Sequence, residues 1–456
     1  MLGCLPAVTS CVMEKAFDAP GSGDDDDKLY VYLNITPLNS VVNTTATDNE
    51  YVKSLRIVLL SDGMIERNEY VPLDQLAVTL TYRSRMETVE GRKEFYLIAN
   101  EESVGPVSFM PSDGVSLPNP LPEGTLHQLL ESYTPEFSVE DVNENTGGTS
   151  DNAPTKGEEL AALLNAVYFS PEYTAGDDGR IYLPYVSYYG TYDIEKGVDH
   201  SLTNPDGIFD PNPNPINMYL VPVATKFTFN FTNYREDAVN INEITINSVN
   251  SQNYLLARVG ENDMTKRLPG SDDDLYWIDW LGEVSHLSQS NAGFYPNINF
   301  NGKYGWITDY ALPFETETNT ANQYTFIGGN IQGFKVLGGA KDNPYFCTVG
   351  PFYIPESKNF YNPITEQNED EQAYYLTFNF EDTKVGEDPQ EYQYVNISNL
   401  KALFRNTHVI INIKMEPGPI KVYAEIAPWI VKSINGWVTE GGVPNPNPFK
   451  IKAADK

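Results

Sequence analysis

Apolar and polar side chains alternate with a period of two along much of this chain, and this alternation constrains its fold more than any other feature. The clearest case is 226–232, where three phenylalanines alternate with lysine, threonine and asparagine. Successive side chains of a strand point to opposite faces, so such a segment buries one face. Similar segments recur at 29–36, 55–60, 95–100, 244–246, 374–380 and 409–413. Many short strands predict a mostly β protein with two antiparallel β-sandwich domains of the transthyretin-like or Greek-key type.

Helical spacing of leucines is confined to two segments, 123–133 and 155–168. In the second, Thr155 and Glu158 have the spacing of a capping box, in which each side chain satisfies a free backbone N–H of the first turn. The sequence therefore predicts one or two short helices in the N-terminal domain.

A proline-rich stretch divides the chain near its middle. Residues 203–215 contain four prolines in thirteen positions, and proline cannot donate to a strand ladder. We therefore expect the domain boundary there, between an N-terminal β-sandwich at 29–205 and a C-terminal β-sandwich at 206–456. The last of these would end in a terminal strand and a Gly/Pro/Asn-rich, flexible tail after residue 437.

The charge balance excludes nucleic acid as the main partner. The chain has 456 residues with Lys+Arg 30 against Asp+Glu 63, a formal net charge of −33, whereas a nucleic-acid site needs basic side chains that displace counterions. No run of about twenty apolar residues is present that would predict a membrane-spanning helix.

The residues that carry most catalytic chemistry lack the usual spacings. The three cysteines and four histidines form no zinc motif, and neither a glycine-rich phosphate loop nor a nucleophile elbow occurs. We therefore predict no catalytic residues, no metal, no cofactor and no enzymatic activity. A glycosidase stays open as a third hypothesis, because the spacing of 63 carboxylates along a sequence carries no information about pairs in space.

The first residues resemble an export signal. Val8–Cys11 resembles a bacterial lipobox, so Cys11 is the predicted lipid attachment site, although it also fits an ordinary residue of a mobile terminus. An acidic linker follows at 14–28, so we expect a clipped lipoprotein signal and acidic linker at 1–28. Its run Asp24–Asp27 fits a solvated stretch, a surface-export cue or the scar of an enterokinase-type tag.

Several segments occur in an order found in a known family. They are LYVYLNI at 29–35, LRIVLLSDG at 55–63, EFYLIAN at 94–100, IYLPYVSYYG at 181–190, LVPVATKFTFNF at 220–231, GPFYIPE at 350–356, LFRNTHVIINI at 403–413, and a strand from 420 that ends in Ala-Pro-Trp at 427–429. Together they resemble the Bacteroidetes-type fimbrillins, the lipoprotein subunits of type V pili. The resemblance covers most of the chain.

This resemblance implies assembly by strand exchange, in which an N-terminal plug strand is replaced by the C-terminal strand of a neighbouring subunit. The implied partners are other pilus subunits and, through the lipid, the outer membrane, with the protein located at the cell surface in a fimbria. The implied plug residues are Leu29, Val31, Leu33 and Ile35, and the implied donor residues are Ile420, Val422, Ala424, Ile426 and Trp429. From the residues alone, each segment also fits an ordinary core strand.

Processing is where the chain departs from the family pattern, in which cleavage usually follows an arginine between the plug and the next strand. No Arg or Lys lies between Lys28 and Lys53, so the cleavage candidates are Lys28, Lys53 and Arg56. Either another protease acts or the plug is retained, as would suit an anchor subunit. The sequence leaves stalk, anchor and tip roles open.

The alternative function is a surface glycan-binding lipoprotein or adhesin that recognises a host glycan or protein. Its candidate ligand aromatics are Trp277, Trp280 and Trp306, which stand among Tyr and Asp side chains. The same tryptophans also fit core or edge-strand positions.

Overall fold

The chain, described here from a computed structural model, divides into two compact units. The N-terminal unit comprises the described residues of 1–39, 48–167 and 174–222, and the C-terminal unit those of 168–173 and 223–456. The structure describes residues 12–14, 29–37, 51–77, 81–110, 115–137, 154–171, 173, 181–194, 216–249, 251–256, 322–329, 331–358, 374–382, 390–397, 402–403, 405, 407–416 and 421–428. The expected domain boundary at 205/206 lies outside these residues.

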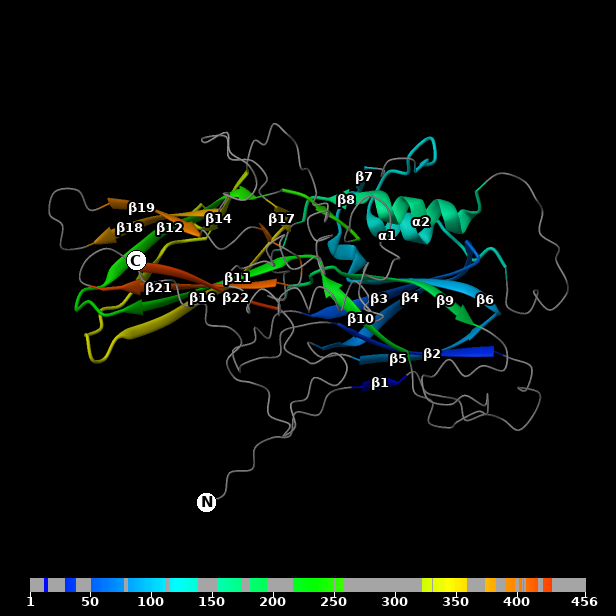
Figure 1. The fold of residues 1–456 in the computed structure, drawn as a ribbon, viewed down its shortest axis with the longest axis horizontal. Helices are drawn as coiled ribbons and strands as arrows, with labels where there is room; N and C mark the ends of the chain where they lie inside the picture. The colour runs from blue at the N-terminus through cyan, green and yellow to red at the C-terminus, as the bar shows by residue number, and fades with distance from the viewer. Residues whose placement is uncertain are drawn as a thin grey trace, which may run out of the picture. The chain divides into compact units, whose positions relative to one another are not determined.

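Eight strands of the N-terminal unit form one continuous ladder, in the order β1-β5-β2-β10-β9-β6-β3-β4. Their bounds are β1 Val12–Glu14, β2 Leu29–Pro37, β3 Val52–Ser61, β4 Met64–Ala77, β5 Thr81–Thr88, β6 Gly91–Ala99, β9 Tyr185–Ile194 and β10 Ile216–Pro222. β10 joins two parts of this ladder, because residues 216–220 pair with β2 whereas Val221 and Pro222 pair with β9. A strand that changes partners in this way turns the corner between two packed layers. Figure 1 shows β2 and β5 in one layer and β3, β4, β6 and β9 in the other.

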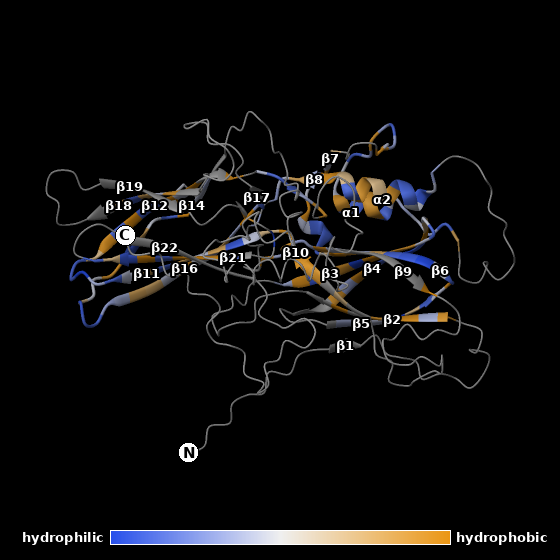
Figure 2. Ribbon diagram, in the orientation of Figure 1, coloured by the Kyte–Doolittle hydropathy of each residue, from blue (hydrophilic) through white to orange (hydrophobic). Residues whose placement is uncertain are grey.

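Two helices cover the outer side of the second layer (Figure 1). They are α1, Leu126–Glu131, and α2, Lys156–Ala166, and each begins with a capping box, formed by Thr125 with Gln128 and by Thr155 with Glu158. Both helices and the second box were predicted from the sequence and are confirmed. In Figure 2 the helices carry apolar and polar residues along their length, as expected for helices with one buried face. Strand β3 is buried at nine of its ten positions, because it has a layer of the protein on each side.

The remaining elements of the N-terminal unit are short. The 3₁₀ helix η2, Glu101–Ser103, directly follows β6, and β7 is Ser108–Phe109. Strand β8, Val167–Phe169, follows α2 without a loop, and its last two residues already belong to the C-terminal unit, where they pair with β13, Asn253–Tyr254. Among the described residues, no helix is both long and apolar enough to cross a membrane.

The C-terminal unit contains two main sheets. One has the order β16-β11-β21-β22, and the other has the order β14-β12-β18-β19, with β15 also paired to β12. The bounds are β11 Thr225–Asn233, β12 Val239–Val249, β14 Asn322–Ile327, β15 Phe334–Val336, β16 Tyr345–Ile354, β18 Tyr374–Asp382, β19 Gln390–Ile397, β21 Thr407–Met415 and β22 Lys421–Pro428; a small pair is formed by β17 Ser357–Lys358 and β20 Ala402–Leu403.

Phenylalanines join these two sheets. The predicted alternation in β11 is confirmed: Phe227, Phe229 and Phe231 are all buried. The ring of Phe326 in β14 lies 4.9 Å from that of Phe227 and 5.0 Å from that of Phe229, and Phe334 in β15 lies 5.2 Å from Phe231, all measured between centroids. Tilted and edge-to-face aromatic pairs of this kind fill the space between two sheets. The mostly β fold predicted from the sequence is therefore observed.

The sheets are mostly antiparallel, as predicted, but three of the described strand pairs run parallel. β1 with β5, β2 with β10, and β11 with β21 pair in parallel. Most of the other pairs are antiparallel. The paired residues of β11 and β21 lie about 180 positions apart in the chain, so no hairpin turn sets the direction of these strands.

Candidate functional site

Strand β2, which contains the predicted plug residues, lies inside a sheet and is paired along both edges. Residues 29–35 pair antiparallel with β5, from Leu29 opposite Thr88 to Ile35 opposite Tyr82. On the other edge Leu33 is opposite Ile216 of β10 in a parallel ladder. β2 therefore lies between β5 and β10, and without it each of these strands would have an open edge on that side.

Three of the four apolar side chains on one face of β2 are buried. Val31, Leu33 and Ile35 are each 1% exposed, whereas Leu29 at the strand's start is half-buried. Their register partners Met86 in β5 and Met218 in β10 are buried as well. Burial of three aliphatic side chains contributes about 1.5–3 kcal/mol each before ordering costs.

Strand β22, which contains the predicted donor residues, lies at the end of its sheet. It pairs antiparallel with β21, and within the described part of the chain the sheet has no further strand beyond it. Val422, Ala424 and Ile426 are the register partners of the buried Ile413, Ile411 and Val409 of β21. The other two predicted donor residues, Ile420 and Trp429, lie outside the described residues.

The two cleavage candidates within the described residues are both in β3. Lys53 is half-buried and lies at a register shift in the β3–β4 ladder, between Val52 and Ser54. Its backbone N–H donates to Asn100 Oδ1 at 2.8 Å, and its Nζ lies 4.8 Å from the centroid of the Tyr182 ring. Arg56 is only 2% exposed, so a protease could take its side chain only after β3 had left the sheet. Other predicted site residues, namely Lys28, Cys11, Trp277, Trp280 and Trp306, lie outside the described residues.

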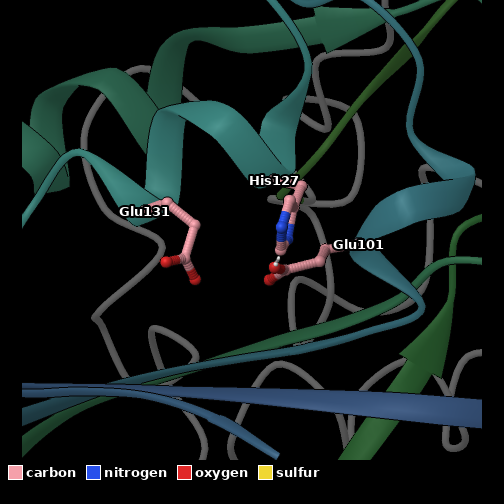
Figure 3. Close-up of side chains that lie close together, drawn as sticks. All are labelled: Glu101, His127 and Glu131. Carbon is pink, nitrogen blue, oxygen red and sulfur yellow. Dashed lines mark hydrogen bonds and ion pairs between the residues drawn. The ribbon is translucent and has the colours of Figure 1, made fainter. Parts of the chain in front are cut away.

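Arg56 lies at the centre of a polar cluster that the sequence analysis missed. Its guanidinium donates to Glu101 of η2 through Nε at 3.0 Å and Nη2 at 2.7 Å, and Nη2 also lies 2.5 Å from Glu131 Oε1 of α1. His127 Nδ1 lies 2.5 Å from the same Glu101 Oε1. Figure 3 shows His127 and Glu131 descending from α1 towards Glu101.

Two carboxylates and an imidazole within reach of one another could in principle bind a metal. The three candidate ligand atoms of Glu101, His127 and Glu131 all lie within 4.8 Å. However, the positive guanidinium of Arg56 already binds both carboxylates and repels a metal cation. Its hydrogen bond also holds the pKa of Glu131 below the usual value. The geometry therefore fits an ionic network that fastens η2 and α1 to β3.

One sequence signal could have indicated part of this cluster. His127 and Glu131 are four residues apart in the predicted helix 123–133 and therefore share a face. Nothing in the sequence links them with Arg56 or Glu101, which come from a different strand and a turn.

A second buried ion pair connects two of the segments that carry the family resemblance. Arg405, from LFRN, and Glu356, from GPFYIPE, have side chains 0% and 1% exposed. Arg405 Nε donates to both carboxylate oxygens of Glu356, at 3.0 and 3.1 Å. Its Nη1 and Nη2 donate to the carbonyls of Leu255 and Tyr254, each at 2.8 Å. This buried guanidinium, hydrogen-bonded through all three of its nitrogens, fixes the chain immediately before β21, the strand to which β22 is paired.

Comparisons with known proteins find likeness in solved structures alone. No protein-family model matches the chain, and no curated protein matches it. The tip fimbrial protein Mfa3 from Porphyromonas gingivalis, crystallised with a C-terminal truncation, matches at 13% identity and a TM-score of 0.39, over 88% of this chain and 100% of that one.

Two further solved structures are similar to the same extent. A fimbrilin from Porphyromonas gingivalis matches at 11% identity and a TM-score of 0.38, over 88% of this chain and 99% of that one. A fimbrial assembly protein from Parabacteroides distasonis matches at 8% identity and a TM-score of 0.34, over 87% and 95%. Because these identities and TM-scores are low, the function is inferred from the pairing and burial of this chain's own strands.

Proposed function

We propose that this chain is a structural subunit of a cell-surface fimbria and that it assembles by strand exchange. In this proposal β2 is the plug, and the C-terminal strand of a neighbouring subunit replaces it. The supporting observation is the position of β2, which is paired along both edges and buries Val31, Leu33 and Ile35 on one face.

Removal of β2 would create a binding site for another strand. β5 and β10 would each lose the hydrogen-bonding partner on the edge that faces β2, and these open edges would flank an apolar slot. An incoming strand restores the main-chain hydrogen bonds, and its alternate side chains occupy the slot left by the three aliphatic residues. β-Augmentation therefore supplies both the affinity and the register of assembly.

β22 is the strand that we propose as the donor. In its own sheet it is paired along one edge, with β21, among the described strands. In the slot of a neighbour it would pair along both edges, with β5 and with β10. The exchange therefore replaces one ladder by two, which offsets the cost of leaving β21.

We also propose the steps that precede assembly. A lipid on Cys11 would tether the exported chain to the outer membrane, as the lipobox-like Val8–Cys11 suggests. Cleavage after Lys53 would release β2 and leave β3 intact from Ser54 onwards. Cleavage after Arg56 would require β3 to open, so Lys53 is the better candidate. A subunit that escapes this cleavage would keep its plug and act as an anchor.

The test is limited trypsin digestion of the purified protein, followed by denaturing gel electrophoresis and negative-stain microscopy. We expect loss of β2 to produce ladders and filaments, and we expect Lys53→Ala to prevent both. Lys156→Ala is the matched control, since Lys156 is exposed on α2, away from the plug. Monomers that persist after β2 has been removed would exclude assembly by strand exchange.

A further inference from the structure

A buried lysine and a buried glutamate form a pair in the N-terminal unit that takes no part in the proposed strand exchange. Lys93 of β6 and Glu66 of β4 both have side chains 0% exposed, and Lys93 Nζ lies 2.7 Å from Glu66 Oε2. The same Nζ donates to Ser61 Oγ of β3 at 2.8 Å. The second carboxylate oxygen, Glu66 Oε1, is buried without a hydrogen-bond partner.

The backbone brings these three side chains together by an irregularity in β4. Ser61 is directly opposite Lys93 in the antiparallel β3–β6 ladder. In the β3–β4 ladder, Leu59 is opposite Arg67 and Leu60 is opposite Ile65, so Glu66 is the extra residue of a β-bulge. A bulge redirects a side chain, and here it places the Glu66 carboxyl beside the Lys93 amine in the interior.

As an ion pair this arrangement is costly. Each buried charge loses its hydration, and the mutual attraction compensates for this loss only if the remaining polar atoms are hydrogen-bonded. This condition is not met, because Glu66 Oε1 has no hydrogen-bond partner. Burial also lowers the pKa of Lys93, although Glu66 opposes the shift, so the neutral and nucleophilic amine forms more readily here than on an exposed lysine.

We propose that Lys93 and Glu66 condense to an isopeptide bond that cross-links β6 to β4. One proton first passes from the Lys93 ammonium to Glu66 Oε2, and the neutral Nζ then attacks the Glu66 carboxyl carbon, which lies one bond beyond Oε2. A C–N bond forms as the C–Oε2 bond breaks. The departing oxygen takes a second proton from Nζ and leaves as water. Ammonium plus carboxylate thus gives a neutral amide plus water, with no oxidant, reductant or other reactant.

The surroundings fit the product better than the ion pair. Condensation removes both buried charges, and release of water from a closed interior favours the amide. The single N–H that remains on Nζ has an acceptor in place, Ser61 Oγ. Two groups held in contact within a rigid core also react with a high effective concentration. This inference is independent of the proposed fimbrial function, because it depends on the interior of one unit alone.

The test is the intact mass of the purified full-length protein, measured by mass spectrometry and compared with that of two variants. We expect the wild type to lack the mass of one water, and Lys93→Arg, which keeps a positive charge but forms no such amide, to have its full mass. Lys156→Arg is the matched control: Lys156 also pairs with a glutamate, Glu159, but is 64% exposed, so the deficit should persist.

Peptide mapping of the wild type keeps the test independent of whether the Lys93→Arg variant folds. After denaturation and digestion, a cross-linked species should join the peptide that contains Glu66 to the peptide that contains Lys93. A wild-type protein of full mass, with Lys93 recovered as a free amine that acetylates in denaturant, would overturn the proposal.

Discussion

At the scale of single residues, the two buried arginines show how polar groups hold this β protein together. The Arg405 guanidinium binds the Glu356 carboxylate and two backbone carbonyls. The Arg56 guanidinium binds the carboxylates of Glu101 and Glu131. A buried charge of this kind stabilises the fold only while its partners are present. Substitution of one partner is therefore more damaging than substitution of both.

Replacement of Arg405 by methionine should lower the free energy of unfolding of the C-terminal unit by about 3–5 kcal/mol, because Glu356 is left charged and buried. Urea denaturation followed by circular dichroism measures the change. The double variant Arg405→Met with Glu356→Gln should recover part of the loss, since it removes the unpaired charge. Equal stabilities of the single and double variants would contradict this view of the pair.

Acid should destabilise the protein through His408. Burial and the nearby Lys226 lower the pKa of His408 from 6.5 to about 3, and its Nε2 lies 2.8 Å from Thr228 Oγ1. Between these two values the unfolded chain binds a proton that the folded chain does not, so stability is lost as the pH falls below about 6.5.

The measurement is the melting temperature as a function of pH. Glu131 and Glu159 have lowered pKa values, and their contributions are lost only as the pH falls below the ordinary glutamate value of 4.5. A decrease of the melting temperature that begins near pH 6.5 therefore indicates protonation of a histidine. His408→Gln should flatten the curve between pH 6.5 and pH 4.5, and an unchanged slope would exclude His408 as its source.

At the scale of elements, close backbone contact decides how α2 meets the sheet. A Cβ added at Gly157 would lie 2.2 Å from the carbonyl oxygen of Gly63 in the β3–β4 turn. Glu136 completes the joint, because its carboxylate accepts from the backbone N–H groups of Ile65, Lys156 and Gly157. The N-terminus of α2 can therefore lie against the turn because Gly157 has no side chain, and the Glu136 carboxylate holds it there.

Gly157→Ala should therefore lower the melting temperature by several degrees, since α2 must move away from the turn. Gly105→Ala is the matched control, because a Cβ at Gly105 would have no neighbour within 4 Å. Differential scanning calorimetry of the two variants measures the contrast. Similar melting temperatures for both would show that α2 tolerates displacement.

At the scale of the whole molecule, the proposed exchange makes the N-terminal unit depend on whichever strand occupies the slot between β5 and β10. Without β2, the unit loses two ladders and the burial of Val31, Leu33 and Ile35. A chain that begins after residue 38 should therefore melt at a lower temperature than the full-length protein. A peptide that binds the slot should raise that temperature in proportion to the logarithm of its concentration.

The peptide to use covers residues 420–428, and its control has aspartate at the positions of Val422, Ala424 and Ile426. We expect the first to restore stability and the second to have no effect, because charged side chains are excluded from an apolar slot. Thermal melting and isothermal titration measure both. Equal behaviour of the two peptides would contradict the proposed donor.

How much of the fold and of the Arg56 cluster could be predicted from the sequence depends on how far apart along the chain the interacting residues lie. Period-two alternation predicted β11, and leucine spacing with a capping box predicted α2, because both patterns are read within about ten residues. The parallel pairing of β11 with β21, the partner change in β10 and the Arg56 cluster were not predicted. Each joins residues that are far apart along the chain, and no local preference selects the partner.

The sequence by itself determined which segments become strands, which faces they bury and where the helices begin, since hydrophobic periodicity and capping act locally. Only the tertiary structure decided that β2 is paired along both edges, that β22 lies at the end of its sheet, and that a bulge brings Glu66 to Lys93. The physical reason is that a strand's sequence specifies its faces, whereas its edges are backbone and are alike in every strand. Pairing along those edges is settled when the packed layers bring particular strands together.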